Sequence, residues 1–135
     1  MKDIWTNIQV VIASIGGWMG WFLGGFDGFL YAIIAFVVID YLTGFMAAVV
    51  EHKLSSEVGF KGIFKKVLIF LLVAVANIID ENLIGSGGAI RTAVIFFYLS
   101  NEGISIIENS SRIGLPIPEK LKDVLEQLKD KEDKR

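Results

Sequence analysis

The chain has 135 residues, of which 53% are hydrophobic, and its formal net charge at pH 7 is −2. Its mean hydropathy is +0.58, and the apolar residues are gathered in long blocks, which argues against an ordinary soluble domain. It contains no cysteine, which excludes a disulfide framework and thiol chemistry.

Four apolar runs, at residues 8–26, 28–50, 63–79 and 89–107, carry few charges. A bilayer core needs about 20 helical residues, with a range of roughly 17–25. The runs therefore predict an all-α integral membrane helical bundle with about four transmembrane helices, occupying residues 1–110. A small soluble helical domain is the alternative, but a chain of this length is too short to bury four such helices on every side.

The first run is rich in glycine, which is a poor helix former in water. Gly16, Gly20 and Gly24 are spaced four residues apart, so on a helix they would form one groove in which a second helix could approach closely. Such packing could occur within one copy or between copies, and a flexible break is the third interpretation. The run lacks a signal-peptide pattern, and we expect it to remain in the mature protein.

The second run carries an acid, Asp40, near its middle. A charge at the centre of a bilayer costs about 2.5–3.5 kcal/mol on insertion scales, so Asp40 should face other helices or water. Thr43 and Gly44 follow at helical spacing and share its face, Thr43 as a polar candidate and Gly44 as a packing candidate.

The segment between the second and third runs is rich in lysine, with Lys53, Lys61, Lys65 and Lys66 near the membrane ends. The turns near residues 27 and 80–88 have no lysine. Because short Lys-rich loops stay in the cytoplasm, the four lysines are predicted topology anchors, with Lys65 and Lys66 snorkelling at the start of the third run. Both termini are then predicted to be cytoplasmic.

Polar residues continue in the third and fourth runs. Asn77 lies at the end of the third run, and Asn101 and Glu102 lie in the fourth, where Arg91, Ile95, Tyr98, Glu102 and Ser105 form one stripe. Two interpretations stay open. The polar stripes could line water or exchange partners on assembly, or they could hydrogen-bond across helices inside a closed bundle.

The last 28 residues hold 14 of the 28 charged side chains. Residues 111–135 are therefore predicted to be a charged cytoplasmic tail, with a short amphipathic helix at about 118–130. Its apolar face would consist of Leu121, Val124, Leu125 and Leu128.

Catalytic and cofactor chemistry finds little support. The single histidine, His52, has no companions for a metal site. The glycines at 85–88 lack the Lys-Ser/Thr of a phosphate loop, and the loop lysines are better explained by topology than by nucleic-acid contacts. We expect neither an enzyme nor a cofactor, metal or nucleic-acid partner.

Several blocks in order resemble the toxin secretion/phage lysis holins. The blocks are DYLTG at 40–44, KLSS at 53–56, GFKGI at 59–63 with the lysines at 65–66, FYLSNEGISIIEN at 97–109 and GLPIP at 114–118. The resemblance covers about residues 28–128, most of the chain, and is weakest in the first run.

The resemblance implies a non-enzymatic protein that accumulates in the bacterial inner membrane, oligomerises and opens large lesions. Its functional partner would be an endolysin that reaches the cell wall or a large protein toxin that is released. Two other functions remain open: a membrane anchor or assembly factor that recruits a cytoplasmic partner through its tail, and a small solute or ion transporter.

Overall fold

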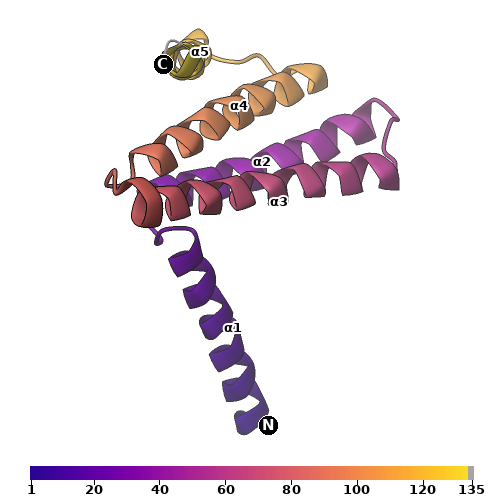
Figure 1. Cartoon of the computed structure of the whole chain (residues 1–135). Coiled ribbons are helices and arrows are strands. Elements are labelled where there is room, and N and C mark those ends of the chain that lie inside the picture. Colours follow the sequence, from indigo (N-terminus) through magenta and orange to yellow (C-terminus); the bar gives the residue numbers. More distant parts are fainter. Residues whose placement is uncertain (134–135) are drawn as a thin grey trace.

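The structure is a computed structural model that describes residues 1–133, with the side chains of residues 1–127. Over these residues it is all-helical (Figure 1). The elements are α1 (Lys2–Phe22), α2 (Gly28–Val50), α3 (Ser56–Ile78), the π-helical turn η1 (Ile79–Ile84), α4 (Ala89–Ile113) and α5 (Glu119–Asp133).

Three helical segments are long and apolar enough to cross a membrane: Gly28–Val50, Ser56–Ile84 and Ala89–Ile113. These correspond to the second, third and fourth predicted runs, so the predicted all-helical fold is confirmed and three of its runs are candidate spans. The first run falls largely in α1, which is not one of these candidate spans. The structure therefore supports three spans, and a fourth is not confirmed.

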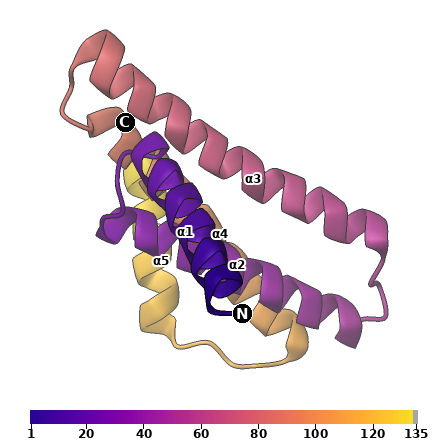
Figure 2. The same ribbon diagram turned by 90° about the horizontal axis from the view of Figure 1, so that it is seen from below.

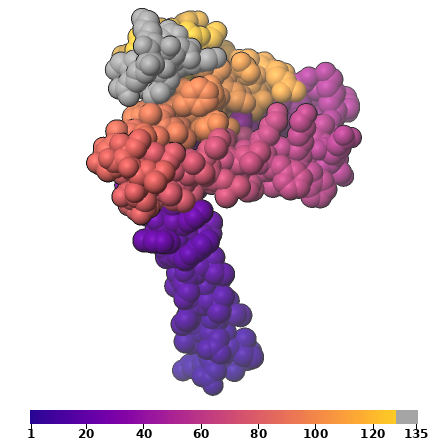
Figure 3. All heavy atoms as spheres, in the orientation of Figure 1, coloured from indigo at the N-terminus to yellow at the C-terminus, as the bar shows by residue number. Residues whose placement is uncertain are grey.

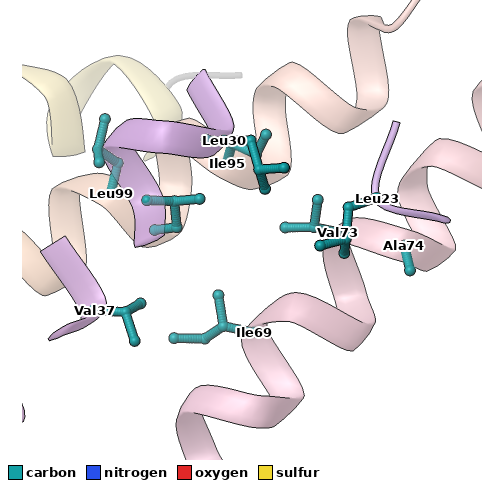
Figure 4. Close-up of a cluster of buried hydrophobic side chains, with 9 residues drawn as sticks. Leu23, Leu30, Val37, Ile69, Val73, Ala74, Ile95 and Leu99 are labelled. Carbon is teal, nitrogen blue, oxygen red and sulfur yellow. The ribbon is translucent and has the colours of Figure 1, made fainter. Parts of the chain in front are cut away.

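The helices α2, α3 and α4 lie side by side, with α3 to one side of the α2–α4 pair (Figures 1 and 2). Aliphatic side chains from all three meet in one buried cluster (Figure 4). The cluster consists of Leu30, Ile33 and Val37 of α2, Ile69, Val73 and Ala74 of α3, Ile95 and Leu99 of α4, and Leu23 of the preceding loop. This cluster fixes how the polar side chains on the same helices face one another.

Helix α1 leaves the bundle at a steep angle and projects as a stalk (Figures 1 and 3). It ends at Phe22, earlier than the predicted run, because Gly24 and Gly25 follow with φ of +94° and +102°. These left-handed conformations are open to glycine and terminate a right-handed helix. Gly24 thus lies in a turn, outside the helical groove predicted for Gly16, Gly20 and Gly24.

The other boundaries follow from caps. α2 has the predicted bounds, and the side chain of Asp27 caps it by accepting from the backbone N–H of Leu30. α3 begins at Ser56, seven residues before the predicted start at 63, because Ser55 caps it by accepting from the N–H of Val58. α4 continues past the predicted end at 107 to Ile113 and stops at Gly114, whose φ is +101°.

The tail helix α5 crosses the outer face of α4 (Figure 1). Leu125 is buried there, and a Cβ added to Gly103 of α4 would stand 2.8 Å from its Cδ2 atom. Leu121 and Val124 of the predicted apolar face are exposed. Leu128 lies outside the described side chains, and residues 134–135 of the predicted tail lie outside the described residues.

The outer surface of the bundle is apolar. Along α3 the large exposed side chains recur at helical spacing: Phe60, Phe64, Val67, Leu68, Leu71, Leu72 and Val75. Soluble monomers rarely expose continuous apolar patches of this kind, whereas a helix face in contact with lipid requires one. The surface agrees with the three candidate spans and supports membrane localisation.

Candidate functional site

One residue from each helix of the bundle contributes to an ion cluster at its centre. Lys66 of α3 places its Nζ atom 2.7 Å from Oδ2 of Asp40 on α2 and 2.7 Å from Oε2 of Glu102 on α4. The three side chains are 10–16% exposed. We call Asp40, Lys66 and Glu102 the ion triad.

Burial away from water makes the ion triad energetically unfavourable. Charges removed from water lose several kcal/mol of solvation each, which close pairing offsets only in part. When all three groups are ionised, two acids and one base also leave one uncompensated negative charge. A closed bundle surrounded by lipid therefore retains electrostatic free energy that access to water would release.

An amide extends the triad toward the end of the bundle that holds residues 51–55. Asn109 of α4 donates through Nδ2 to Oδ1 of Asp40 at 3.0 Å and to the hydroxyl of Thr43 at 3.1 Å. Its Oδ1 accepts from Arg112 at 3.3 Å, and Arg112 pairs with Glu51 at 2.6 Å. The result is a continuous polar chain from the centre of the bundle to its end.

A cleft of about 400 Å³ opens beside this polar chain. Its lining includes Lys53, Gly62, Lys66, Asn109 and Arg112. Asp40 also lines the cleft, so water entering from the loop at residues 51–55 would reach two members of the ion triad, Asp40 and Lys66. The hydrogen bond from the guanidinium of Arg112, which lines the cleft, holds the pKa of Glu51 below its ordinary value.

A second polar cluster fixes the other end of the bundle. Arg91 of α4 donates to the carbonyls of Leu23 at 2.6 Å and Gly25 at 3.0 Å, and it pairs with Asp27 at 2.8 Å. Hydrogen bonding to Arg91 lowers the pKa of Asp27. We call Arg91 with Leu23, Gly25 and Asp27 the elbow clamp, because it holds the turn between α1 and α2.

Asp80 and Asn77 reinforce this end. Asp80, in η1, accepts from the backbone N–H of Ile90 at 3.1 Å and of Arg91 at 2.7 Å, and from the hydroxyl of Ser86. Asn77 donates to the carbonyl of Phe22 at 3.4 Å. The start of α4 is thereby tied to η1, and the end of α1 to α3.

The structure brings together only some of the predicted polar residues. Asp40, Thr43 and Glu102 share the central network, whereas Asn77 lies at the elbow. Asn101 is half-buried beside Glu102, and no hydrogen bond links it to the ion triad in the described part of the chain. Lys66, one of the four predicted topology anchors, is placed between the two acids and pairs with both.

The remaining predicted residues are spread over the molecule. Lys53 makes a loose pair with Glu51 at 3.6 Å, and Lys61 and Lys65 are exposed. A Cβ at Gly44 would meet Asn109, and one at Gly20 would meet the Phe26 ring, while Gly16 has open space around it.

Asn109 and Arg112 did not stand out in the sequence, although they complete the polar chain. The stripe predicted on the fourth run ends at Ser105, and Asn109 continues it by one further turn. Extending the pattern from Glu102 by seven residues, two helical turns, would have found Asn109.

The ion triad and its polar chain are suited to an exchange of charged partners and not to covalent catalysis. Among residues 1–127, no group of three His, Cys, Asp or Glu side chains is placed to hold a metal ion. The ion triad consists of groups that can exchange one charged partner for another, or for water, without covalent change.

Comparison with known proteins gives the family. The model of the bacteriophage holin family matches residues 17–130. An uncharacterised 14.9 kDa protein encoded in the nagH 3′ region of Clostridium perfringens is 40% identical over 97% of this chain and 99% of its own length. An uncharacterised protein of Listeria monocytogenes is 44% identical over 84% of this chain and 81% of its own length.

No solved structure matches this chain. Holins are non-enzymatic, in agreement with the expectation that the chain is not an enzyme. The family model and the similar relatives each cover most of the sequence, including all three helices that carry the ion triad. The chain therefore belongs to the bacteriophage holin family.

Proposed function

We propose that this protein is a holin that oligomerises in the bacterial cytoplasmic membrane and forms large, non-selective lesions. The lesions release an endolysin, leading to host cell lysis, or a large protein toxin. The protein acts with lipid and with further copies of itself, and the released protein need not contact it.

The ion triad is the observation that carries this proposal. An apolar outer surface holds the protein in lipid, while Asp40, Lys66 and Glu102 are confined in the interior. Such a monomer is metastable, because assembly around a water-filled lumen would hydrate the three charges. The cleft beside Lys66 supplies the route by which water first reaches them.

The orientation follows from the lysines. Residues 51–55 and the exposed Lys61 are proposed to face the cytoplasm, as is the tail after Gly114. The turns at residues 23–27 and 85–88 then face outward. With three spans the C-terminus is cytoplasmic, and the side of the N-terminus depends on α1.

Inducible expression in a bacterium tests the proposal. Growth should stop abruptly, together with loss of membrane potential and escape of a large cytoplasmic reporter protein. Glu102→Gln should change the onset time, because it removes one charge of the ion triad. Glu108→Gln is the matched control, since Glu108 is an exposed acid on the same helix.

A retained membrane potential with abundant, inserted protein would contradict the proposal. Two further outcomes would favour the other functions. Loss of all activity on deletion of residues 116–135 would indicate an anchor that works through its tail, and saturable flux of one solute would indicate a transporter.

A further inference from the structure

Helix α1 points away from the bundle at a steep angle instead of continuing along its length (Figure 1). The helices α2, α3 and α4 run roughly together, and α1 departs from the end where η1 also lies (Figures 1 and 2). If the bundle crosses the membrane, that end lies at the bilayer surface, and α1 is directed along this surface. We propose that α1 is an interfacial helix that lies in the outer surface of the membrane, with its apolar face in the lipid.

The elbow clamp holds α1 in this direction. Arg91 binds two carbonyls and one carboxylate of the five-residue connection between α1 and α2. A Cβ on Gly24 would stand 2.5 Å from Nε of Arg91, so the clamp closes directly on the glycine turn. The side chain of Arg91 is 7% exposed, and its bonds would break if α1 swung into line with the bundle.

The residues of α1 divide into two faces. One face carries large apolar side chains at helical spacing: Ile4, Ile8, Val11, Ile12, Ile15, Trp18, Met19 and Phe22. The opposite face carries mainly polar and small residues, Thr6, Gln9, Ala13, Gly16, Gly17 and Gly20, with the exposed Val10 and Trp21 at its edge. Apart from Phe22, the large apolar side chains named here are exposed, so α1 has an unpartnered apolar face along its whole length.

Lipid is the occupant that suits this face. α1 leaves the bundle at the end where the apolar outer surface of α2 and α3 stops (Figure 1). Trp5, Trp18 and Trp21 are exposed on α1, and indole rings favour the membrane–water boundary. The only charges in α1 are Lys2 and Asp3, so attachment depends on apolar burial rather than on anionic headgroups.

A spanning α1 would face a cost that the interfacial position avoids. With Phe22 at the surface, Gln9 would lie about 20 Å deep at 1.5 Å per residue, within a hydrocarbon core of roughly 30 Å. Its exposed amide would then lack partners. In the interface, Gln9 and Asn7 remain in contact with water.

The proposal sets the side of the N-terminus. Lys2 lies on the same side of the membrane as Leu83 of η1 and opposite Lys53. This differs from the prediction that both termini are cytoplasmic, which required α1 to cross the membrane. The interfacial proposal concerns the position of α1 in the membrane and does not depend on lesion formation.

Single cysteines provide the test, because the chain contains none. Three pairs of exposed positions place one cysteine on each face at nearly the same height: Thr6→Cys with Ile8→Cys, Gln9→Cys with Val11→Cys, and Ile15→Cys with Gly17→Cys. Each variant of the full chain is labelled with an environment-sensitive dye and reconstituted in phosphatidylethanolamine–phosphatidylglycerol vesicles. Lipids with quenchers at known depths then report how deep each dye lies.

An interfacial α1 gives a difference within every pair: the dye at position 8, 11 or 15 is quenched at shallow depth, and its partner remains in water. The three pairs should give the same result. Equal depth within pairs and a steady change between them would show that α1 spans and would overturn the proposal. Shielding of both members that increases with protein density would overturn it in favour of a second copy.

Sidedness provides an independent readout. Leu83→Cys and Lys2→Cys should react with an impermeant maleimide on one side of sealed vesicles, and Lys53→Cys only on the other. Unreacted Lys53→Cys on the first side also shows that no lesion admitted the reagent. Reaction of Lys2→Cys together with Lys53→Cys, from a side on which Leu83→Cys stays unreacted, would contradict the proposal, because a lesion would expose all three positions.

Discussion

At the residue scale, the main structural finding is the position of Lys66. Its place in the sequence, beside Lys65 at the start of an apolar run, is typical of a residue that snorkels to the membrane surface. The structure pairs it instead with Asp40 and Glu102, which come from two other helices. Spacing within one helix shows which residues share a face, but it does not show which faces of different helices meet. Asp40 and Glu102 could therefore be selected from the sequence, whereas the partner that joins them could not.

Replacing Lys66 should destabilise the bundle strongly. Lys66→Met leaves two carboxylates facing each other without a cation, and loss of one partner from a buried pair costs roughly 3–5 kcal/mol in proteins. Lys65→Met is the matched control, because Lys65 is exposed on the same helix and should lose less than about 0.5 kcal/mol. The free energy of unfolding in detergent micelles measures both.

A rescue variant separates charge from shape. Adding Asp40→Asn and Glu102→Gln to Lys66→Met removes the repulsion and should recover part of the lost stability. Equal stability of Lys66→Met and Lys65→Met would show that the ion triad does not form.

The Asp27–Arg91 pair predicts a defined pH dependence. Arg91 lowers the pKa of Asp27 from its ordinary value of 3.8, so the pair stabilises the fold above pH 3.8. This stability is lost as the pH falls through the lowered pKa. Because the Asp27 side chain is 46% exposed, its contribution should stay below about 1 kcal/mol.

Acid unfolding of wild type and Asp27→Asn measures this contribution. The wild-type advantage at neutral pH should shrink as acid protonates Asp27, while other carboxylates affect both proteins alike. An advantage that grew toward low pH would contradict the assigned ion pair.

At the element scale, the apolar runs predicted the helix bounds well where a run and its helix begin and end at the same residues. The α2 bounds agree with the prediction because the Asp27 cap and the end at Val50 both coincide with the edges of the apolar run. α3 begins earlier than predicted because its first two turns, from Ser56 on, mix charged and apolar residues, so hydropathy alone placed its start too late. The tail helix was predicted, but its contact with α4 depends on Gly103, a residue that no local pattern marks.

Docking of α5 on α4 should depend on Leu125. Leu125→Ala removes the side chain packed over Gly103 and should weaken docking by about 2 kcal/mol, the low end for a buried leucine. Cleavage of the tail by added protease should then become roughly ten-fold faster or more. Leu121→Ala is the control, since Leu121 is exposed.

The contact between α5 and α4 also constrains which solvent, lipid or water, surrounds this face of α4. Gly103 neighbours Glu102 of the ion triad, so docked α5 brings charged residues to the level of the triad. Hydrocarbon does not tolerate such charges, and docking therefore requires water on this face of α4. Equal cleavage of Leu125→Ala and wild type in vesicles would show that α5 is already undocked there.

At the scale of the whole molecule, an apolar exterior encloses a charged interior, with an elbow at one end and a crossing helix over α4. The composition predicted the exterior, and the family resemblance implied the lesion. The direction of α1 was not predictable, because it depends on Arg91 reaching a turn more than sixty residues away in the sequence. These features together describe a protein that is held in lipid and whose interior gains from contact with water.

Release of graded dextrans from vesicles tests this account most directly. Purified protein is added to vesicles loaded with dextrans that range from below to well above the size of a folded endolysin. The account predicts that all sizes leave together once release begins, and that Glu102→Gln shifts the onset while Glu108→Gln does not. Vesicles that hold every large dextran despite abundant inserted protein, or that pass one small solute with saturation, would contradict it.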